Sequence, residues 1–364
     1  MNILLISNGH GEDLIAEKLA ICLINKSADI KLYVLPQVGE GHIFDSLPIV
    51  KIGPQKIMPS GGFLKSFQSF TTDLRHGLLG LHKKQINNAK KHEYDYIIAI
   101  GDFFPFICAA LFLKTKKLIL IATAKSDLFE PHYAIERYFF KKYNTQIFAR
   151  DEITALNLQS YGINAFYVGN IMIDLIEDAY KTRKNRVDIL PKKKDKTELT
   201  QVIGVLPGSR KEAVSNFKII KQVINNLPVE WHFLLAIPTH LNKNNFKCDD
   251  IKHKYNIVNF NQMLVESNFV IGLAGTANEQ CAALGIPVFT FKGTGPQTTK
   301  KRFKQQNMLL RGCSCFIDHK KSDIIAKNIK KKINDKFFLE MAQKKGSLLM
   351  GNPGAAERII ELLL

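Results

Sequence analysis

Short apolar runs alternate with amphipathic segments along the whole chain, and the runs lack the apolar–polar alternation of a half-exposed strand. Continuous apolar strands separated by helices are typical of parallel sheets that helices cover on both faces. The pattern therefore predicts two doubly wound α/β domains in tandem, with ligands bound at the carboxyl ends of the strands and hence in a cleft between the domains. The predicted strands cover residues 2–6, 30–35, 96–100, 117–121, 146–148 and 166–168, and then 202–206, 232–236, 257–260, 269–271 and 288–291.

The two series of strands are separated by a polar, lysine-rich stretch with one proline, KTRKNRVDILPKKKDKTELTQ, at residues 181–201. Such composition is typical of a linker or an exposed excursion beside one. We therefore expect an N-terminal domain over 1–175 and a second domain over 176–345. The closing segment 346–364 ends in NPGAAERIIELLL, which has a helix-start signal and helical apolar spacing, so we expect a helix that packs back across the cleft.

The charge of the chain is uneven. Its 51 basic and 33 acidic residues give a net charge of +18 over 364 residues. Residues 1–175 contribute 19 − 16 = +3, and residues 176–364 contribute 32 − 17 = +15. Such a field favours anionic partners, although a solvated lysine-rich surface explains it equally well. No zinc-finger, helix-turn-helix or RNA-binding signature is present, so we do not expect a nucleic-acid partner.

The sequence also bears on compartment and on metal chemistry. The opening MNILLIS lacks the basic region of a secretory signal, and the most apolar window, residues 97–113, is shorter than a bilayer span and contains Asp102 and Pro105. We therefore expect a cytoplasmic protein without transmembrane helices.

The six cysteines form no C-x-x-C pair, and no His/Cys cluster has zinc spacing, so no metal is expected. Cys313 and Cys315 are only a weak hint of metal or redox chemistry.

Two glycine loops in the second half follow predicted strands. In VIGVLPGSRKEA, Gly208 would let the backbone approach a ligand, Ser209 would cap the next helix, and Arg210 would bind phosphate oxygens. In GLAGTANEQ, Gly275 and Thr276 would present N–H groups and a hydroxyl to a diphosphate at a helix start. A capped helix start with a surface arginine is the structural alternative for the first loop.

Two further side chains complete this candidate site. Glu279 lies one turn inside the helix after Thr276, where its carboxylate could accept two ribose hydroxyls; alternatively it is a solvated residue favoured by the helix dipole. Gln297, in the loop KGTGPQTT, could hold a sugar hydroxyl or the diphosphate. The basic run that follows, KKRFK, is either a phosphate or lipid-headgroup contact or a solvated helix face.

The opening loop SNGHGEDLIA joins a predicted strand to a predicted helix. Its spacing is G-x-G, with Gly9 and Gly11 on either side of His10 and no third glycine. Glu12 and Asp13 follow in the first helical turn. The loop is a candidate for a cofactor cradle, a catalytic loop or a tight turn.

The ordered set LPGSR, GLAGTANEQCAALGIPVF and KGTGPQTT, with ISNGHGEDLIA and GNPGAAERI at the two ends, resembles the lipid-A-disaccharide synthase family of glycosyltransferases, most closely its divergent synthase-related branch. The resemblance covers most of the chain. It implies a GT-B fold, a UDP-sugar donor bound mainly by the C-terminal domain, a lipid-linked acceptor bound mainly by the N-terminal domain, inversion at the anomeric carbon and no required metal. It further implies that Asp102 matches a functionally important aspartate, and that Asp13 matches the last residue of the family's opening loop.

Two reactions follow as hypotheses. An inverting transferase moves an N-acetylglucosamine-type sugar to a lipid-linked acceptor, and its base would be His10 or Asp102, since both follow predicted strands. Their structural alternatives are a turn-closing histidine and a helix N-cap. The second hypothesis is a UDP-sugar 2-epimerase, which needs no acceptor. A membrane-bound acceptor is favoured by residues 61–84, where an apolar stripe has basic flanks, although an ordinary core-facing helix has the same pattern.

Overall fold

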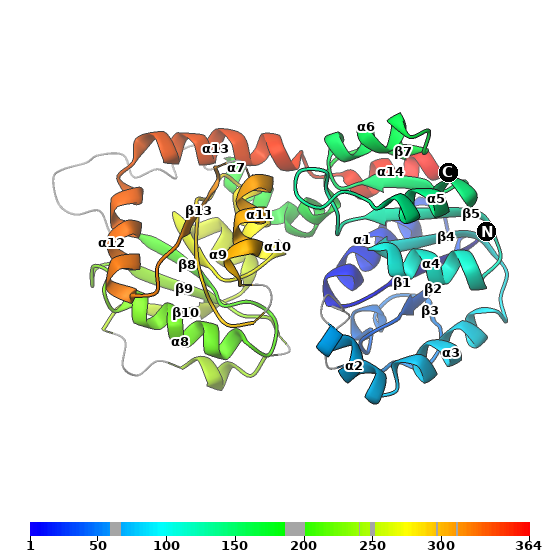
Figure 1. The fold of residues 1–364 in the computed structure, drawn as a ribbon, viewed down its shortest axis with the longest axis horizontal. Coiled ribbons are helices and arrows are strands. Elements are labelled where there is room, and N and C mark those ends of the chain that lie inside the picture. Colours follow the sequence, from blue (N-terminus) through cyan, green and yellow to red (C-terminus); the bar gives the residue numbers. More distant parts are fainter. Residues whose placement is uncertain (59–66, 186–200, 240, 248–251, 296–297, 311) are drawn as a thin grey trace. The chain divides into compact units, whose positions relative to one another are not determined.

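The computed structural model divides into two compact units, each described here by itself (Figure 1). Unit 1 comprises Met1–Leu175 and Gly354–Leu364, and unit 2 comprises Ile176–Pro353. The structure describes residues 1–58, 67–185, 201–239, 241–247, 252–295, 298–310 and 312–364.

Unit 1 is built on a parallel sheet of seven strands in the order β3-β2-β1-β4-β5-β6-β7. Its central strands are buried on both faces, as their continuous apolar sequences predict. The order reverses between β1 and β4, and such a reversal opens a crevice at the carboxyl ends of the strands. The strands are β1 (Asn2–Ser7), β2 (Lys31–Pro36), β3 (Val50–Lys51), β4 (Tyr94–Gly101), β5 (Thr115–Ala122), β6 (Gln146–Ala149) and β7 (Ala165–Phe166).

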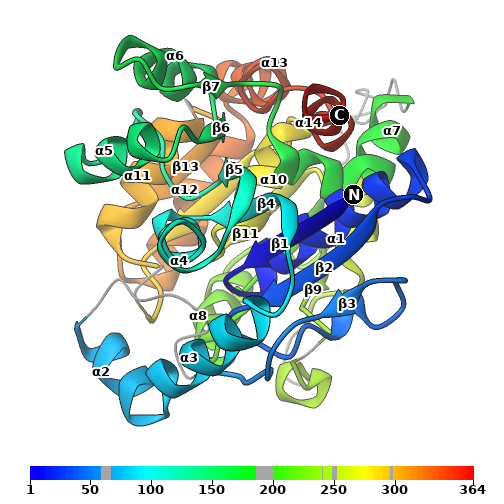
Figure 2. The same ribbon diagram turned by 90° about the vertical axis from the view of Figure 1, so that its right-hand side faces the viewer.

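Helices cover both faces of this sheet (Figure 2). Five of them are α1 (His10–Lys26), α3 (Leu78–Ala89), α4 (Phe103–Phe112), α5 (Ala134–Lys142) and α6 (Glu152–Ser160), with α2 (Phe67–Arg75) before α3. The predicted C-terminal helix is present as α14 (Ala355–Leu363) and packs against α1 within unit 1. The carboxylate of Asp174 accepts hydrogen bonds from the backbone N–H groups of Gly354, Ala355 and Ala356, at 2.7–3.2 Å, and so fixes the start of α14.

Unit 2 is built on a parallel sheet of six strands in the order β10-β9-β8-β11-β12-β13. One apolar cluster of its interior contains Phe233, Phe289 and Phe291. The strands are β8 (Val202–Leu206), β9 (His232–Ala236), β10 (Tyr255–Val258), β11 (Phe269–Gly272), β12 (Val288–Phe291) and β13 (Ser314–Ile317). The helices are α7 (Glu177–Asn185), α8 (Ala213–Ile224), α9 (Phe260–Glu266), α10 (Thr276–Ala283), α11 (Lys300–Leu310), α12 (Ser322–Ile333) and α13 (Lys336–Met350).

Some boundaries differ from the sequence-based expectation. The first part of the predicted linker, 181–185, is helical and ends α7, and residues 186–200 lie outside the described part. Strands β3 and β13 were not predicted, because one is two residues long and the other has a polar start, SCFI. The strand predicted at 257–260 is shifted, since Phe260 begins α9.

The predicted apolar stripe over 61–84 faces the interior where it can be followed. Leu78 and Leu81 are buried against Val38 and Met58. The part before residue 67 lies outside the described residues, as do the side chains of Phe67 and Phe70. The core-facing alternative is therefore correct for the described part of the stripe, and this stripe does not form an exposed apolar surface there.

Within the described ranges, no helix combines the length and the apolar character that crossing a bilayer requires.

Candidate functional site

Two loops of unit 2 meet at the carboxyl edge of its sheet. The loop after β8 contains Gly208, whose φ of 101° lies in the left-handed region that favours glycine. A Cβ at this position would lie 3.2 Å from the backbone oxygen of Leu273, in the loop after β11. The glycine of LPGSR is therefore required by both its conformation and its close approach to the neighbouring loop.

Helix α10 begins where the sequence places a phosphate-binding turn. Gly275 is its N-cap residue and Thr276 its first residue, and both are exposed. The first N–H groups of a helix have no partner within the helix, so an exposed start of this kind can bind an anion. Glu279 lies in the first turn and is only 8% exposed, which excludes the solvated alternative for this carboxylate.

Two buried asparagines hold these loops in place. Asn278 Nδ2 donates to the backbone oxygens of Gly272 (3.1 Å) and Ala274 (2.8 Å), and so fixes the turn before α10. Asn216, on α8, donates from Nδ2 to Pro207 O at 3.2 Å, and its Oδ1 accepts the backbone N–H of Thr294 at 2.7 Å. It thus fastens the loop after β8 to the loop after β12.

Neither asparagine was among the predicted site residues. The available signal was a polar residue on the apolar side of a helix, which by itself does not distinguish a loop anchor from a solvated residue.

The role predicted for Ser209 is wrong in one respect. Helix α8 begins at Ala213, preceded by Glu212, so Ser209 lies in the turn before the helix and does not cap it. The hydrogen bond from Ala213 N to Arg210 O closes that turn. Ser209 is exposed and Arg210 is half-buried. The predicted Gln297 lies outside the described residues.

In unit 1, the opening loop carries His10 to the edge of the sheet. Gly9 has a φ of 132° and precedes α1, while His10 is the first residue of that helix and is exposed. A Cβ added at Gly11 would meet no atom within 4 Å, so close packing inside the unit does not require the second glycine. The first glycine makes the turn, and the second leaves open space beside His10.

Asp13 lies behind this loop as a buried carboxyl group. It is 5% exposed, and the hydroxyl of Ser7, at the end of β1, donates to its Oδ1 at 2.5 Å. Burial raises the pKa of Asp13 to about 7, while the hydrogen bond from Ser7 opposes the shift. A carboxyl group with such a pKa exchanges its proton near neutral pH, as general acid–base chemistry requires.

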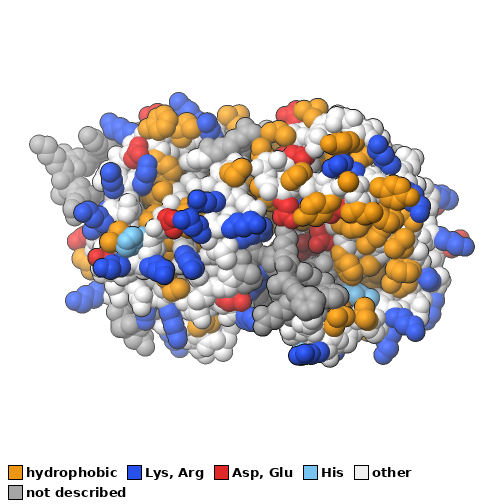
Figure 3. Space-filling model, viewed as in Figure 1, with side chains coloured by type: hydrophobic (Ala, Val, Ile, Leu, Met, Phe, Trp, Pro, Cys, Tyr) orange, Lys and Arg blue, Asp and Glu red, His pale blue; other side chains and the backbone are white. Residues whose placement is uncertain are grey.

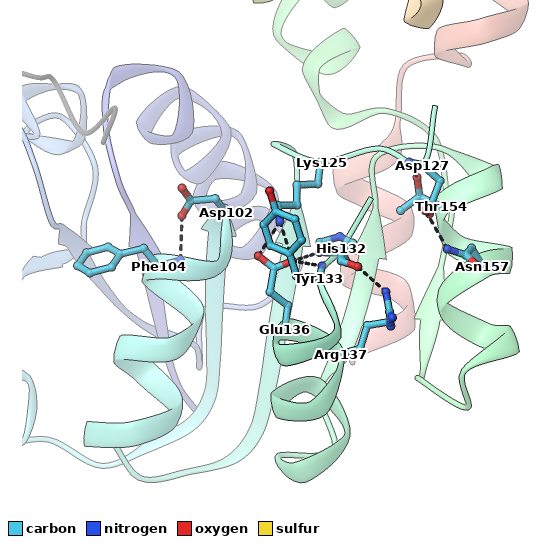
Figure 4. Close-up of polar contacts among 10 residues, drawn as sticks. All are labelled: Asp102, Phe104, Lys125, Asp127, His132, Tyr133, Glu136, Arg137, Thr154 and Asn157. Atoms are coloured by element: carbon cyan, nitrogen blue, oxygen red, sulfur yellow. Dashed lines mark hydrogen bonds and ion pairs between the residues drawn. The ribbon is translucent and has the colours of Figure 1, made fainter. Parts of the chain in front are cut away.

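Asp102 follows β4 and is the N-cap of α4. Its Oδ1 accepts the backbone N–H of Phe104 at 2.9 Å, and the residue is exposed (Figure 4). Gly101 has a φ of 115°, and a Cβ there would lie 2.9 Å from Cγ of Glu12. The loops after β1 and β4 are therefore in contact, and they bring His10, Glu12 and Asp102 to one edge of unit 1.

A buried ion-pair network lies at the end of the next strand, β5 (Figure 4). Both carboxylate oxygens of Glu136 accept hydrogen bonds from Lys125 Nζ at 2.8 Å, and Nδ1 of His132 donates to one of them at 3.1 Å. Burial raises the pKa of Glu136, but the hydrogen bonds from His132, Lys125 and the Tyr133 backbone outweigh it and lower this pKa. The Lys125 ammonium lies 3.5 Å from the centre of the Tyr133 ring. The sequence does not predict that these side chains form an ion-pair network.

The structure also bears on metal and thiol chemistry. In the described ranges, no group of His, Cys, Asp and Glu side chains is arranged to hold a metal ion. Cys313 is fully buried, and burial raises the pKa of its thiol to about 11 and also raises that of Cys315. These two thiols therefore form little thiolate at neutral pH, and the Cys313–Cys315 pair is not a reactive redox site.

A cavity of about 650 Å³ lies at the opposite, amino edge of the unit 1 sheet. It is lined by residues such as Met1, Asp95 and Lys117, and none of the predicted site residues borders it. Its lining comes from the first residues of the strands and from surface lysines, and it includes none of the glycine loops or candidate bases described above.

The architecture is similar to that of several solved structures. No protein-family model and no curated protein matches the chain at a significant level. Among solved structures, it is similar to the UDP-GlcNAc 2-epimerase from Neisseria meningitidis bound to UDP-GlcNAc, with 16% identity over 100% of this chain and 99% of the other and a TM-score of 0.60. It is similar to MurG from Acinetobacter baumannii, with 11% identity, coverage of 99% and 98% and a TM-score of 0.62.

A third similar structure is CalG4, the calicheamicin glycosyltransferase, with 13% identity, coverage of 99% and 97% and a TM-score of 0.59. At such identities a likeness establishes the fold and not the activity. Together with the seven- and six-stranded parallel sheets, these similarities confirm the predicted architecture. The chain has the GT-B fold, made of two doubly wound, Rossmann-like α/β domains.

Proposed function

We propose that this chain is an enzyme that acts on a UDP-sugar of the N-acetylglucosamine type. The observation that carries the proposal is the exposed start of α10 at Gly275 and Thr276, packed beside the Gly208 loop. An exposed helix start flanked by glycine turns suits a diphosphate. Structures with this fold that were solved with UDP-GlcNAc or UDP support the choice of nucleotide.

The donor would be held by residues of unit 2. Backbone N–H groups at Gly275 and Thr276 would receive the diphosphate, and the half-buried Arg210 would add a guanidinium beside Gly208 and Ser209. Glu279 is our candidate for the ribose hydroxyls, and Gln297 our candidate for the sugar. With this set, the charge of the leaving diphosphate would be met by the helix start and Arg210, and we expect no metal requirement.

Two reactions are open to such a site. The similar structures favour 2-epimerisation, since epimerases are prominent among them. The motif set favours inverting transfer to a lipid-linked acceptor, as in lipid A biosynthesis, with unit 1 as the acceptor side and Gly9, Gly11, Glu12 and Asp13 in its loop. In both reactions a base is required, and Asp102 and His10, which follow β4 and β1 at one edge of unit 1, are our candidates for it.

The two reactions are separated by incubation with UDP-N-acetylglucosamine alone. An epimerase is expected to give the 2-epimer without any acceptor, detectable by proton NMR of the anomeric region. A transferase is expected to leave the donor unchanged until a lipid-linked sugar is added and then to release UDP. Neither product under both conditions would contradict the proposed enzyme class.

Nucleotide binding can be tested separately from turnover. We expect UDP-GlcNAc to raise the melting temperature of the chain, more than GDP- or dTDP-sugars do, because a ligand that binds only the folded state stabilises it. Arg210→Ala is expected to weaken binding about tenfold or more, since it removes a charge-assisted contact to phosphate. Lys211→Ala is the matched control, because this exposed neighbour also removes one positive charge. Equal losses in both variants would show that Arg210 acts only through net charge.

A further inference from the structure

A side chain of α11 holds the start of α10. Gln306 Nε2 donates to the backbone oxygen of Gly275 at 3.0 Å, and Gln306 Oε1 accepts a hydrogen bond from Asn278 Nδ2 at 3.1 Å. The orientation of this amide is fixed, because a carbonyl oxygen only accepts and because the Asn278 nitrogen also donates to two backbone oxygens. Gln306 therefore fastens α11 to the N-cap residue of α10.

The bond to Gly275 determines which way one peptide group faces. In a planar trans peptide, the C=O of one residue and the N–H of the next point in opposite directions. Since the Gly275 oxygen is held towards α11, the N–H of Thr276 points away from α11. The same reasoning applies one residue earlier, where Asn278 Nδ2 holds the oxygen of Ala274 at 2.8 Å and thereby sets the direction of the Gly275 N–H.

The two N–H groups are open to a ligand. Gly275 and Thr276 are exposed, and neither N–H donates to a backbone or side-chain oxygen of the described chain. A Cβ at Gly275 would meet no atom within 4 Å, so close packing does not hold this peptide in place. The Gly275 oxygen accepts one hydrogen bond from Asn278 N, within the first turn of α10, at 3.0 Å and another from Gln306. Of these two bonds, the one from Gln306 comes from outside the helix.

We propose that Gln306 is a positioning residue for the diphosphate site of the proposed function, on which this inference rests. It holds the Gly275–Thr276 peptide with the N–H side towards the ligand. A flipped peptide would present the Gly275 carbonyl oxygen instead, which repels phosphate oxygens, whereas an N–H group binds them. Glycine permits such a flip, because it lacks the Cβ that restricts the backbone of other residues.

The positive charge of unit 2 attracts anions by a different route. Residues 176–364 carry most of the net charge of the chain, and Lys and Arg side chains are spread over the face of unit 2 shown in Figure 3. Lys301 and Lys304 are exposed on α11 itself. This field acts on any anion and does not depend on the direction of one peptide, so the test has to separate the two contributions.

The test is isothermal titration calorimetry of the full chain with UDP and with uridine, which lacks the diphosphate. Gln306→Met keeps an unbranched side chain of similar length and removes both hydrogen bonds. We expect this variant to bind UDP about tenfold more weakly and uridine within about twofold of the unaltered chain, because only the diphosphate uses the Thr276 N–H. Damage to the packing of α10 against α11 would instead weaken both ligands.

Gln305→Met is the matched control, since Gln305 is the half-buried neighbour and accepts a hydrogen bond from Arg302 Nη1, at 3.3 Å, on the same helix. It should bind both ligands as the unaltered chain does. Gln306→Glu tests the donor alone, because a carboxylate still accepts from Asn278 but cannot donate to Gly275. Its loss of UDP affinity should be at least as large as that of Gln306→Met. Gln305→Glu adds the same charge one residue away and should keep most of the UDP affinity.

The outcomes separate this inference from the proposed function. Unchanged UDP binding by Gln306→Met, equal losses for UDP and uridine, or equal losses in the Gln305 variants would overturn the inference and leave the proposed function standing. Failure of the unaltered chain to bind UDP would overturn the proposed function and the inference with it.

Discussion

Asp13→Asn is expected to raise the free energy of unfolding of unit 1 at pH 8 by up to about 4 kcal/mol. The pKa of Asp13 is raised from 3.8 to about 7 by burial, and each pKa unit corresponds to about 1.4 kcal/mol. The folded state therefore holds a proton that the unfolded state releases between about pH 4 and pH 7. Stability from this group is fully present below pH 4, decreases as the pH rises to 7, and is then constant.

The measurement is urea unfolding at several pH values between 4 and 8.5, followed by circular dichroism. The asparagine variant should lack the decrease between pH 4 and 7, and its advantage should vanish near pH 4. Trp231, the single tryptophan, lies in unit 2, so its fluorescence reports whether that unit is unaffected. Asp45→Asn is the control, because Asp45 is an exposed aspartate whose pKa is lowered, by hydrogen bonds from Lys51 and His42. Parallel pH profiles for the Asp13 variant and the unaltered chain would contradict the assignment.

Asp102→Asn is expected to lower turnover by about 10²- to 10⁴-fold, the usual contribution of a general base. Asparagine is as good an N-cap as aspartate, so this change keeps the role of residue 102 at the start of α4 and removes only its basicity. Asp102→Ala removes both and is expected to cost about 1 kcal/mol of stability in addition. The comparison of the two variants separates the capping role from the chemical role.

Asp151→Asn is the matched control, since Asp151 caps α6 in the same unit by accepting the backbone N–H of Thr154. Its turnover should be unchanged. His10→Ala tests the other candidate base in the same assay, UDP release from UDP-sugar and acceptor or epimer formation. Rates near those of the unaltered chain in both the Asp102 and the His10 variants, with folding intact by circular dichroism, would exclude both residues as the base.

Burying Asp13 has a cost in stability at neutral pH. A neutral carboxyl group at the end of β1 costs little to bury, whereas the ionised form is costly. The chain would therefore be more stable with asparagine there at neutral pH, as expected above. Retaining an aspartate at such a position is typical of sites where stability is exchanged for chemistry.

Much of the fold could be predicted from the sequence because strands buried on both faces are continuous apolar runs. All eleven predicted strands coincide with observed strands to within two residues at each end, for instance 202–206 with β8 and 96–100 with β4. Short or polar strands such as β3 and β13 do not have this signature, and only pairing with a neighbour makes them strands.

The candidate site was predictable in part for the same reason. Gly9 and Gly208 follow strands and have a positive φ, and turns of this kind are visible in a sequence because other residues rarely tolerate that conformation. Gly275 also follows a strand, but its φ is −93° and a Cβ there would meet no atom within 4 Å, so neither reason requires a glycine at that position. The helix start before Ala213 was misplaced by several residues, since local propensity does not fix where a loop ends.

What the sequence by itself determined is therefore the class of fold, the positions of most strands along the chain and the loops that follow them, because these depend on local periodicity and glycine. What only the tertiary structure decided depends on residues that are distant in the chain. The hydrogen bond from the Thr294 backbone to Asn216 and the Lys125–Glu136 ion pair both arise from packing. The raised pKa of Asp13 likewise depends on how completely the fold removes its carboxyl group from water.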